Sequence, residues 1–273
     1  MMSAVYQLGY RLAMLCAGAG ALYIADFMSW RAAYLAMAGL TLVGIGGCLM
    51  SPPLDRPREA KDKRAPSFAV SFVEPLGDLL RRHGPALIVI LVLVAIYRLP
   101  DFVSGVMANP LYIDLGFTKS DIATVSKLYG VWIGIAGAFG GGVAVARLGL
   151  MPSLIIGGVA ASSSHLMLAL LASLPLLTLS VSAESFASGF AGAALIAYMS
   201  SLVSPAFAAT QYALLSSLYA LPGKLIGGLS GVMVDEFGYV RFFVATAAIG
   251  IPVVALSLTV WRMQGREPRE APA

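Results

Sequence analysis

Long apolar segments separated by short polar connections run along almost the whole chain. A helix that crosses a lipid bilayer needs about 20 consecutive, mostly apolar residues. Eight segments reach this length, at 5–24, 32–50, 85–106, 122–145, 153–172, 176–203, 212–234 and 242–261. The alternating segments of about ten residues that are typical of membrane β-barrels are absent from the sequence. Because backbone polar groups in lipid must bond to one another, the pattern predicts an all-α integral membrane protein.

The amino-acid composition supports a membrane protein and excludes several soluble classes. Of the 273 residues, 59% are hydrophobic and 12% are charged, whereas soluble domains carry about 25% charged residues. So few charges leave too little polar surface for a soluble enzyme, a nucleic-acid-binding domain or a disordered chain. Cys16 and Cys48 lie in apolar stretches without a Cys-X-X-Cys or Cys/His pattern, so neither a disulfide framework nor a zinc site is expected.

Basic residues gather in the connections that the predicted spans place on one side of the membrane. The only long polar stretch, 51–84, carries seven Lys and Arg residues; Arg147 and the tail beyond residue 262 fall on the same side. By the positive-inside rule, we expect the linker and the C-terminus to be cytoplasmic. Acidic residues interleave with the linker bases, which favours a solvated linker over a specific lipid or nucleic-acid site.

The order of the segments is two helices, a basic linker and six helices. We therefore predict four parts: 1–50, the last two helices of an N-terminal bundle; 51–84, a cytoplasmic linker; 85–262, a six-helix C-terminal bundle; and 263–273, a cytoplasmic tail. Transporters of the major facilitator type have six helices, a linker and six helices. About eight transmembrane helices would match that plan without its first four. The first segment is interpreted as a span rather than a cleaved signal peptide, because no clear cleavage site follows it.

Ionisable residues inside apolar spans are costly and commonly mark a transport pathway. Six stand out, and they comprise four cations and two acids: Arg11, Arg98, Lys127, Lys224, Asp101 and Glu184. Positive charge in lipid is costly unless an anion or water accompanies it. If these groups face one cavity, the surplus of cations suits a substrate that carries carboxylates or phosphates.

Arg98 and Asp101 are three residues apart, so their side chains share one face of a helix. Pro100 lies between them; it removes a backbone donor and can kink the helix there. A kink beside two charges is typical of a binding site in a discontinuous helix. The alternative is a neutralised structural ion pair. Asp101 is the best candidate for a proton carrier, because burial favours the neutral acid whereas a nearby cation favours the carboxylate.

The other ionisable residues leave alternatives open. Glu184 is the second candidate proton carrier, and the small residues that follow it favour helix packing over a ligand pocket. Lys224 lies near the middle of its span and cannot easily reach water, which favours a functional role. Lys127 and Arg11 lie closer to the ends of their spans, where they either snorkel to the interface or contact substrate.

Polar residues without charge give weaker signals. Gln211 is a candidate substrate-binding residue. His165 follows three serines, and a hydrogen bond within the bundle is favoured there over a proton relay. Glycines at helical spacing, from Gly130 to Gly142, indicate a close helix crossing. The sequence has no Ser/His/Asp set, no metal-ligand cluster and no strand–loop–helix phosphate site. Neither enzymatic activity nor a cofactor is therefore expected.

Several motifs resemble the AmpG-type muropeptide permeases of the major facilitator superfamily, which are related to acetyl-CoA transporters. They are LGYRLAM at 8–14, YRLPD at 97–101, GF at 116–117 before IATVSK at 122–127, GG at 141–142 running to RLG at 147–149, and SPAFAATQYALLSS at 204–217. Glu184 fits an acidic position in the family's tenth helix. Arg98 and Pro100 stand where a lysine and a glycine are expected. The resemblance covers nearly the whole chain, from about the family's fifth helix onward.

This resemblance implies a proton-coupled transporter that imports anionic cell-wall turnover products across the bacterial inner membrane by alternating access. These muropeptides are sugar–peptide fragments with an anhydro-muramyl unit. Asp101 and Glu184 would carry protons, and the substrate-binding residues would be Arg98, Lys127, Lys224, Gln211 and Arg11. The alternative is a non-transporting truncated chain, or one subunit of a split permease, with a membrane partner that supplies the remaining N-terminal helices.

Overall fold

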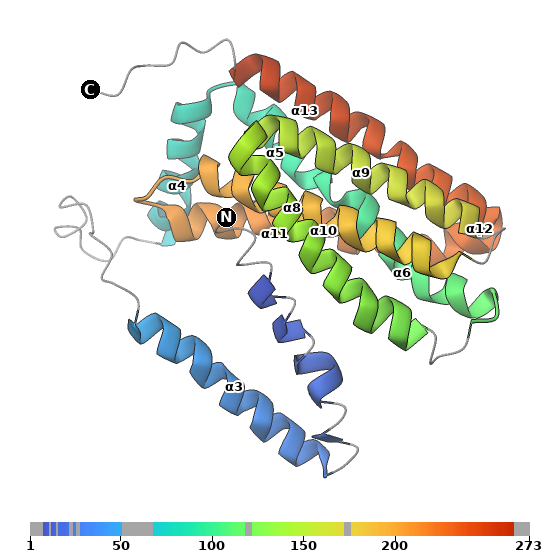
Figure 1. Ribbon diagram of the computed structural model, residues 1–273. Helices are drawn as coiled ribbons and strands as arrows, with labels where there is room; N and C mark the ends of the chain where they lie inside the picture. Colours follow the sequence, from blue (N-terminus) through green and yellow to red (C-terminus); the bar gives the residue numbers. More distant parts are fainter. Residues whose placement is uncertain are drawn as a thin grey trace. The chain divides into compact units, whose positions relative to one another are not determined.

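The computed structural model describes residues 8–10, 12–14, 16–21, 24–25, 28–50, 68–117, 122–171 and 176–264. Every regular element in these ranges is a helix (Figure 1), which confirms the predicted all-α class. The chain divides into two compact units. One comprises Tyr6–Ala65, and the other comprises Pro66–Ala273 together with Met1–Val5.

In the unit Tyr6–Ala65, the main element is helix α3, Trp30–Met50, and a short π-helix η1 covers Cys16–Gly20. The hydroxyl of Ser29 accepts a hydrogen bond from the backbone N–H of Ala32 at 3.2 Å, so it caps the start of α3 as serine commonly does. Helix α3 is long and apolar enough to cross a membrane, in agreement with the predicted span 32–50. Arg11 lies outside the described residues.

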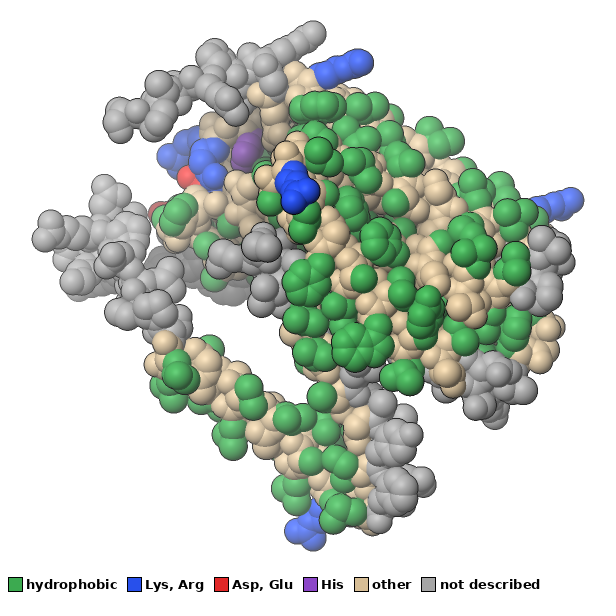
Figure 2. All heavy atoms as spheres, viewed as in Figure 1, with side chains coloured by type: hydrophobic (Ala, Val, Ile, Leu, Met, Phe, Trp, Pro, Cys, Tyr) green, Lys and Arg blue, Asp and Glu red, His purple; other side chains and the backbone are tan. Residues whose placement is uncertain are grey.

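The unit that contains Pro66–Ala273 is a bundle of helices (Figure 1). Its elements are α4 Phe68–His83, α5 Ala86–Tyr97, α6 Leu99–Asp114, η3 Ala123–Tyr129, α8 Gly130–Leu148, α9 Leu150–Leu171, α10 Leu177–Leu202, α11 Ala208–Gly227, α12 Ser230–Ala248 and α13 Gly250–Gln264. Large aliphatic and aromatic side chains remain exposed on most of these helices, and apolar side chains cover much of the face seen in Figure 2. A surface of this kind suits lipid rather than water.

Six helical segments in the described residues are long and apolar enough to span a membrane. They are Trp30–Met50, Ala86–Asp114, Thr124–Leu148, Leu150–Leu170, Leu177–Leu202 and Ser230–Gln264. Most of the predicted spans match one of these segments. The predicted span 212–234 is instead divided between α11 and the start of α12. The chain turns at Gly238, whose φ of 77° lies in the left-handed region, as expected for the predicted loop around 235–241.

A close helix crossing joins α8 and α10. A Cβ atom on Gly137 would overlap the carbonyl of Phe186, and one on Gly189 would overlap the carbonyl of Gly134. The two backbones therefore touch where only glycine fits, as small residues allow in membrane helices. This confirms the packing role predicted for the glycines between Gly130 and Gly142 and for the small residues after Glu184. Helix α9 packs on the other side of α10.

Candidate transport site

The first spanning segment of the bundle is broken at Arg98. Helix α5 ends at Tyr97 and α6 begins at Leu99, and Arg98 adopts φ −100° and ψ 2° between them. Pro100 occupies the first turn of α6, where its missing N–H would have no partner in the helix anyway. The sequence predicts a kink at Pro100, and the structure has a break two residues earlier, at Arg98. It places Asp101 in the first turn of α6, where the helix dipole favours a negative charge.

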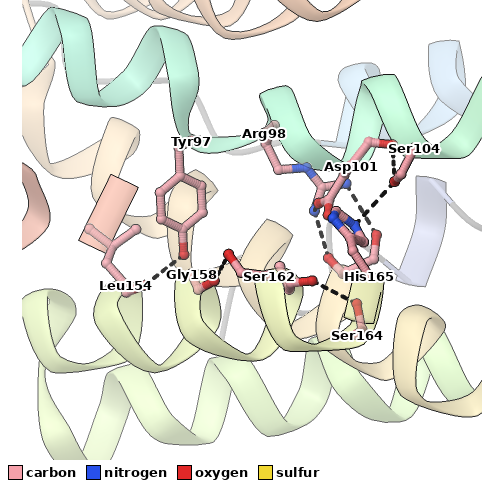
Figure 3. A network of polar contacts seen from close by, with 11 residues as sticks. Tyr97, Arg98, Asp101, Ser104, Leu154, Gly158, Ser162, Ser164 and His165 are labelled. Carbon is pink, nitrogen blue, oxygen red and sulfur yellow. Dashed lines mark hydrogen bonds and ion pairs between the residues drawn. The ribbon is translucent and has the colours of Figure 1, made fainter. Parts of the chain in front are cut away.

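The Asp101 carboxylate lies between two nitrogen-bearing side chains (Figure 3). Its Oδ2 atom is 2.8 Å from Nη1 of Arg98, and its Oδ1 atom is 3.3 Å from Nε2 of His165 on α9. The side chains of Arg98 and Asp101 are 18% and 12% exposed. The pair is therefore largely removed from solvent, and the carboxylate joins α6 to α9.

His165 is fully buried and contacts α6 twice. Besides Asp101, its Nε2 atom lies 3.1 Å from the hydroxyl of Ser104. Its Nδ1 atom has no hydrogen-bond partner in the described part of the chain. An imidazole can bind a proton at one nitrogen and release it from the other. The predicted hydrogen bond of His165 within the bundle is confirmed, and the same nitrogen also contacts the candidate proton carrier.

Arg98 also connects the site to α10. Its Nη1 atom donates to the backbone carbonyl of Ser188 at 2.8 Å, and its Nη2 atom donates to the Ser188 hydroxyl at 3.2 Å. Glu184 is half-buried on the same helix. It lies four residues before Ser188, so the two side chains share a face. The guanidinium group thus links Asp101 to the face of α10 that carries the second acid.

Tyr97 fixes the end of α5 against α9. Its hydroxyl donates to the carbonyl of Leu154 at 2.8 Å (Figure 3). A Cβ atom on Gly157 would lie only 2.8 Å from the Tyr97 hydroxyl oxygen, so this glycine makes room for the ring. The neighbouring residue, Arg98, is held in register with α9 as a result.

Lys224 is not part of this polar group. Lys224 is exposed on α11, whereas the adjacent Gly223 is buried against Phe102 of α6. It lies in an exposed apolar stripe with Leu221, Leu225 and Leu229, which recur at helical spacing. The backbone of Lys127 lies in η3, and its side chain is outside the described part. π-Helical turns such as η3 are frequent at functional sites.

The structure gives Gln211 a different role from the predicted substrate contact. Its side chain is fully buried and makes four hydrogen bonds. The amide nitrogen donates to the Pro75 carbonyl and to Asp78 Oδ2, both at 2.9 Å. The amide oxygen accepts from Arg82 at 3.2 Å and from the Ser204 backbone N–H at 2.7 Å. These bonds use the full capacity of the amide, so we assign Gln211 to the anchoring of α4 on α11.

Asp78 completes this anchor. Its carboxylate pairs with Arg82 one turn later at 2.9 Å and is partly exposed. Burial raises the pKa of Asp78, but the Gln211 hydrogen bond and the Arg82 charge outweigh burial, so the pKa lies below its usual value. The residues from Phe68 to His83 are therefore a docked helix, whereas the sequence favoured a solvated linker over the whole of 51–84. The sequence predicts that the interleaved acids and bases of this stretch are solvated, but two of them, Asp78 and Arg82, hold α4 on α11 through Gln211.

The sequence does not predict that Arg98 contacts Ser188 or that Asp101 contacts His165. Ser104 and Ser188 carry no strong signal, because serines recur throughout these small-residue helices. His165 was visible as a histidine in an apolar span. Its spacing from Asp101 along the chain gives no sign that α6 and α9 meet.

Comparison with known proteins identifies similar chains. The protein named "Putative transporter AmpG 4" of Rickettsia felis is 32% identical over 259 residues, which cover 92% of this chain and 62% of the relative. "Putative transporter AmpG 1" of Rickettsia conorii is 30% identical over 276 residues, covering 94% and 65%. "Putative transporter AmpG 3" of Rickettsia prowazekii is 28% identical over 269 residues, covering 94% and 62%. No protein-family model matches the chain.

The helical spans indicate a multi-pass membrane protein, and the relatives that it resembles are named as putative transporters. The chain is similar to proteins named AmpG over more than nine tenths of its length, which confirms the resemblance seen in its motifs. It spans about 62–65% of the length of the relatives just described. Because those relatives are named as transporters, they also support the prediction that the chain is not an enzyme.

Proposed function

We propose that this chain acts in proton-coupled import of anionic cell-wall turnover products, the muropeptides, by alternating access. The observation that carries the proposal is the Asp101 carboxylate held between Arg98 and His165 inside the bundle. The three residues come from a helix break and from a second helix, so a shift between α6 and α9 would change the surroundings of the carboxylate. The names of the AmpG relatives support the transporter class.

The proposed coupling step is the reversible binding of a proton by Asp101. When the proton binds, an O–H bond forms on the carboxylate and the ion pair with Arg98 loses its negative partner. Arg98 keeps its two bonds to Ser188 on α10. The energy of the α6–α10 connection therefore depends on the protonation state of Asp101, as a coupled transporter requires. His165 would pass the proton on: one N–H bond forms as the other breaks.

The proposed substrate contacts are the cations of the spans. Muropeptides carry peptide carboxylates, which are complementary to Arg98, Lys127, Lys224 and Arg11. The position of Lys224 supports its inclusion, because a charge in an exposed apolar stripe is costly if that stripe faces lipid. We therefore assign the Lys224 face of α11 to the transport pathway. Glu184 is the proposed second proton carrier, on the face of α10 that Arg98 reaches.

We place the protein in the bacterial inner membrane, with the linker and the C-terminus in the cytoplasm. One end of the bundle carries exposed Arg81, Arg147 and Arg262. Among the described residues, the connections at the opposite end contain one Lys or Arg, Arg241, beside Asp114, Asp235 and Glu236. This asymmetry supports the predicted orientation under the positive-inside rule.

The test is uptake of a radiolabelled anhydro-muramyl tripeptide into membrane vesicles that contain the chain, with an imposed pH gradient. Asp101→Asn and Glu184→Gln should each abolish proton-driven uptake at normal expression. Arg241→Gln, an exposed cation of α12, is the matched control and should leave uptake intact. Normal uptake by both acid variants would contradict the proposal.

The alternative, a non-transporting subunit, is tested in the same vesicles. Uptake by this chain alone would support a transporter. Uptake that requires a co-expressed membrane protein with the helices corresponding to the start of the AmpG relatives would support a split permease. No uptake in either case, with both proteins present in the membrane, would contradict transport.

A further inference from the structure

Helix α4 has three sides that differ in chemistry and in surroundings. Pro75 and Leu79 are buried against the bundle, where α4 packs on α11 and α5. A second, apolar side is exposed: Val73, Leu76 and Leu80 are 67%, 49% and 55% accessible. With 3.6 residues per turn, these three side chains fall within about 60° around the helix axis. We call them the α4 stripe.

The third side of α4 is polar. It carries Glu74, Asp78, Arg81 and Arg82. Asp78 and Arg82 contact each other and Gln211 of α11, so they lie at the edge of the polar side that is nearest to α11. The polar side lies roughly opposite the α4 stripe at 100° per residue. One side of α4 thus faces the bundle, the next is apolar and exposed, and the third is polar. Helices that lie at a membrane surface combine an apolar and a polar side in this way.

The chain direction places α4 next to the membrane rather than across it. Gly84 has φ 51°, a left-handed conformation that favours glycine, and its N–H donates to the carbonyl of Leu80 at 2.8 Å. This ends α4, and the apolar span of α5 begins at Ala86. Figure 1 shows α4 at the end of the bundle where α5 starts, running in a different direction from α5. Two residues, Gly84 and Pro85, therefore separate the end of α4 from a segment that is long and apolar enough to span a membrane.

The charge beside the stripe matches a membrane surface. The last turn of α4 contains Arg81, Arg82 and His83. Arg81 is exposed, and its guanidinium reaches back along the helix, since a Cβ atom on Gly77 would lie 3.9 Å from Nη2. Gly77 borders the α4 stripe, so this cation sits at the stripe's edge. Lys and Arg in such positions attract the phosphates of anionic lipids.

We infer that α4 lies in the interface of the lipid bilayer, with Val73, Leu76 and Leu80 toward the acyl chains and Arg81 at the headgroups of anionic lipids. Water is a poor environment for three adjacent aliphatic side chains. The flanking cation and the direct continuation into a span favour lipid over a protein partner. The α4 stripe and the Gln211 anchor would then hold the linker at the membrane surface. The inference does not depend on the transported substrate or on proton coupling.

Site-directed fluorescence in proteoliposomes tests the inference. Cys16 and Cys48 are exposed and unpaired, so both are replaced by serine. An environment-sensitive fluorophore is then attached to the otherwise full chain through Leu76→Cys or Leu80→Cys. Glu74→Cys is the matched control, since it lies about 160° around the helix from Leu76. Doxyl-labelled phosphatidylcholine quenches fluorophores in the bilayer, and iodide quenches those in water.

The labels at positions 76 and 80 should be quenched by the doxyl lipid, whereas the label at 74 should be quenched by iodide. Added phosphatidylglycerol should increase lipid quenching at 76, and Arg81→Gln should remove that increase. Iodide quenching at both 76 and 80 would overturn the inference in favour of a solvated stripe. Protection of both positions from both quenchers would overturn it in favour of a protein partner, another part of this chain included.

Discussion

Asp101 Oδ1 on α6 lies 3.3 Å from Nε2 of His165 on α9. This contact of a carboxylate with the histidine therefore joins two helices. The same carboxylate pairs with Arg98 through its other oxygen. A buried acid shared by two nitrogen bases on separate helices responds to small helix movements, because its electrostatic surroundings depend on distances of a few ångströms. This relationship underlies the first two predictions.

Substitution of His165 should separate hydrogen bonding from charge. His165→Gln retains an N–H that can donate to Asp101, whereas His165→Leu removes the donor and leaves Oδ1 without it. We expect His165→Gln to retain part of the proton-driven uptake and His165→Leu to lose it, with both proteins present at normal levels. Equal uptake by the two variants and the unmodified chain would rule out a role for His165 in coupling.

Arg98 and Asp101 should behave as a coupled pair in a stability measurement. Arg98→Leu leaves a buried carboxylate without its cation, which costs about 3–5 kcal/mol for pairs of this kind. The double variant Arg98→Leu/Asp101→Leu should be less destabilised than Arg98→Leu alone, because it leaves no uncompensated charge. Thermal unfolding of the purified protein in detergent measures both, with Arg262→Leu as the exposed control. A double variant that is as destabilised as Arg98→Leu, or more so, would contradict a buried pair.

The α8–α10 crossing should be sensitive to a single methyl group. Gly189→Ala forces a Cβ atom into the Gly134 carbonyl, and overpacking of this kind costs about 1–3 kcal/mol. Gly105→Ala on α6 is the control, since nothing lies within 4 Å of its added Cβ; we expect it to be neutral or slightly stabilising. The comparison is made by thermal unfolding in the same detergent, and equal stabilities would show that the helices can separate without loss.

The docking of α4 should weaken in acid. The pKa of Asp78 in the folded protein lies below its usual value, because the Gln211 hydrogen bond and the Arg82 charge outweigh burial. Its ionised form therefore stabilises docking fully above the ordinary aspartate pKa of about 3.9, and this contribution is lost as the pH falls through the lower native value. Hydrogen exchange of residues 68–83, corrected for intrinsic rates, should rise over that range.

Two variants check the origin of this pH dependence. Asp78→Asn should remove most of it, because no carboxylate remains to titrate. Gln211→Leu should raise exchange across α4 at every pH, because it leaves Asp78, Arg82 and the Ser204 N–H without the amide. An unchanged exchange pattern in Gln211→Leu would mean that the amide does not anchor the helix.

The sequence was sufficient for the fold class and for an interruption of the helix near Arg98. Span lengths follow from hydropathy, and the kink predicted at Pro100 follows from the missing N–H of proline. The partners of Asp101 depend on which helices meet, and spans built from Gly, Ala and Ser carry little pattern that specifies neighbours. Gln211 shows the converse problem: a buried amide that binds substrate and one that anchors a helix look alike in sequence.

The same distinction applies to Lys224 and α4. The cost of a lysine near the middle of a predicted span favours a functional role, but the exposure of Lys224 on an apolar stripe of α11 emerges only from the packing of Gly223 on Phe102. In the sequence, the apolar residues of 68–83 fall within the polar stretch that is predicted to be a linker. Their helical spacing becomes informative once Pro75 and Leu79 are seen to face the bundle.

The most direct test of the account compares proton-driven accumulation with substrate counterflow in proteoliposomes that contain the Asp101→Asn protein. Counterflow exchanges labelled for unlabelled muropeptide without net proton movement, so it reports on binding and alternating access alone. We predict that Asp101→Asn retains counterflow and loses accumulation driven by a pH gradient. Retention of both activities would contradict the assignment of Asp101 as the proton carrier, and loss of both in a folded protein would make it a structural residue.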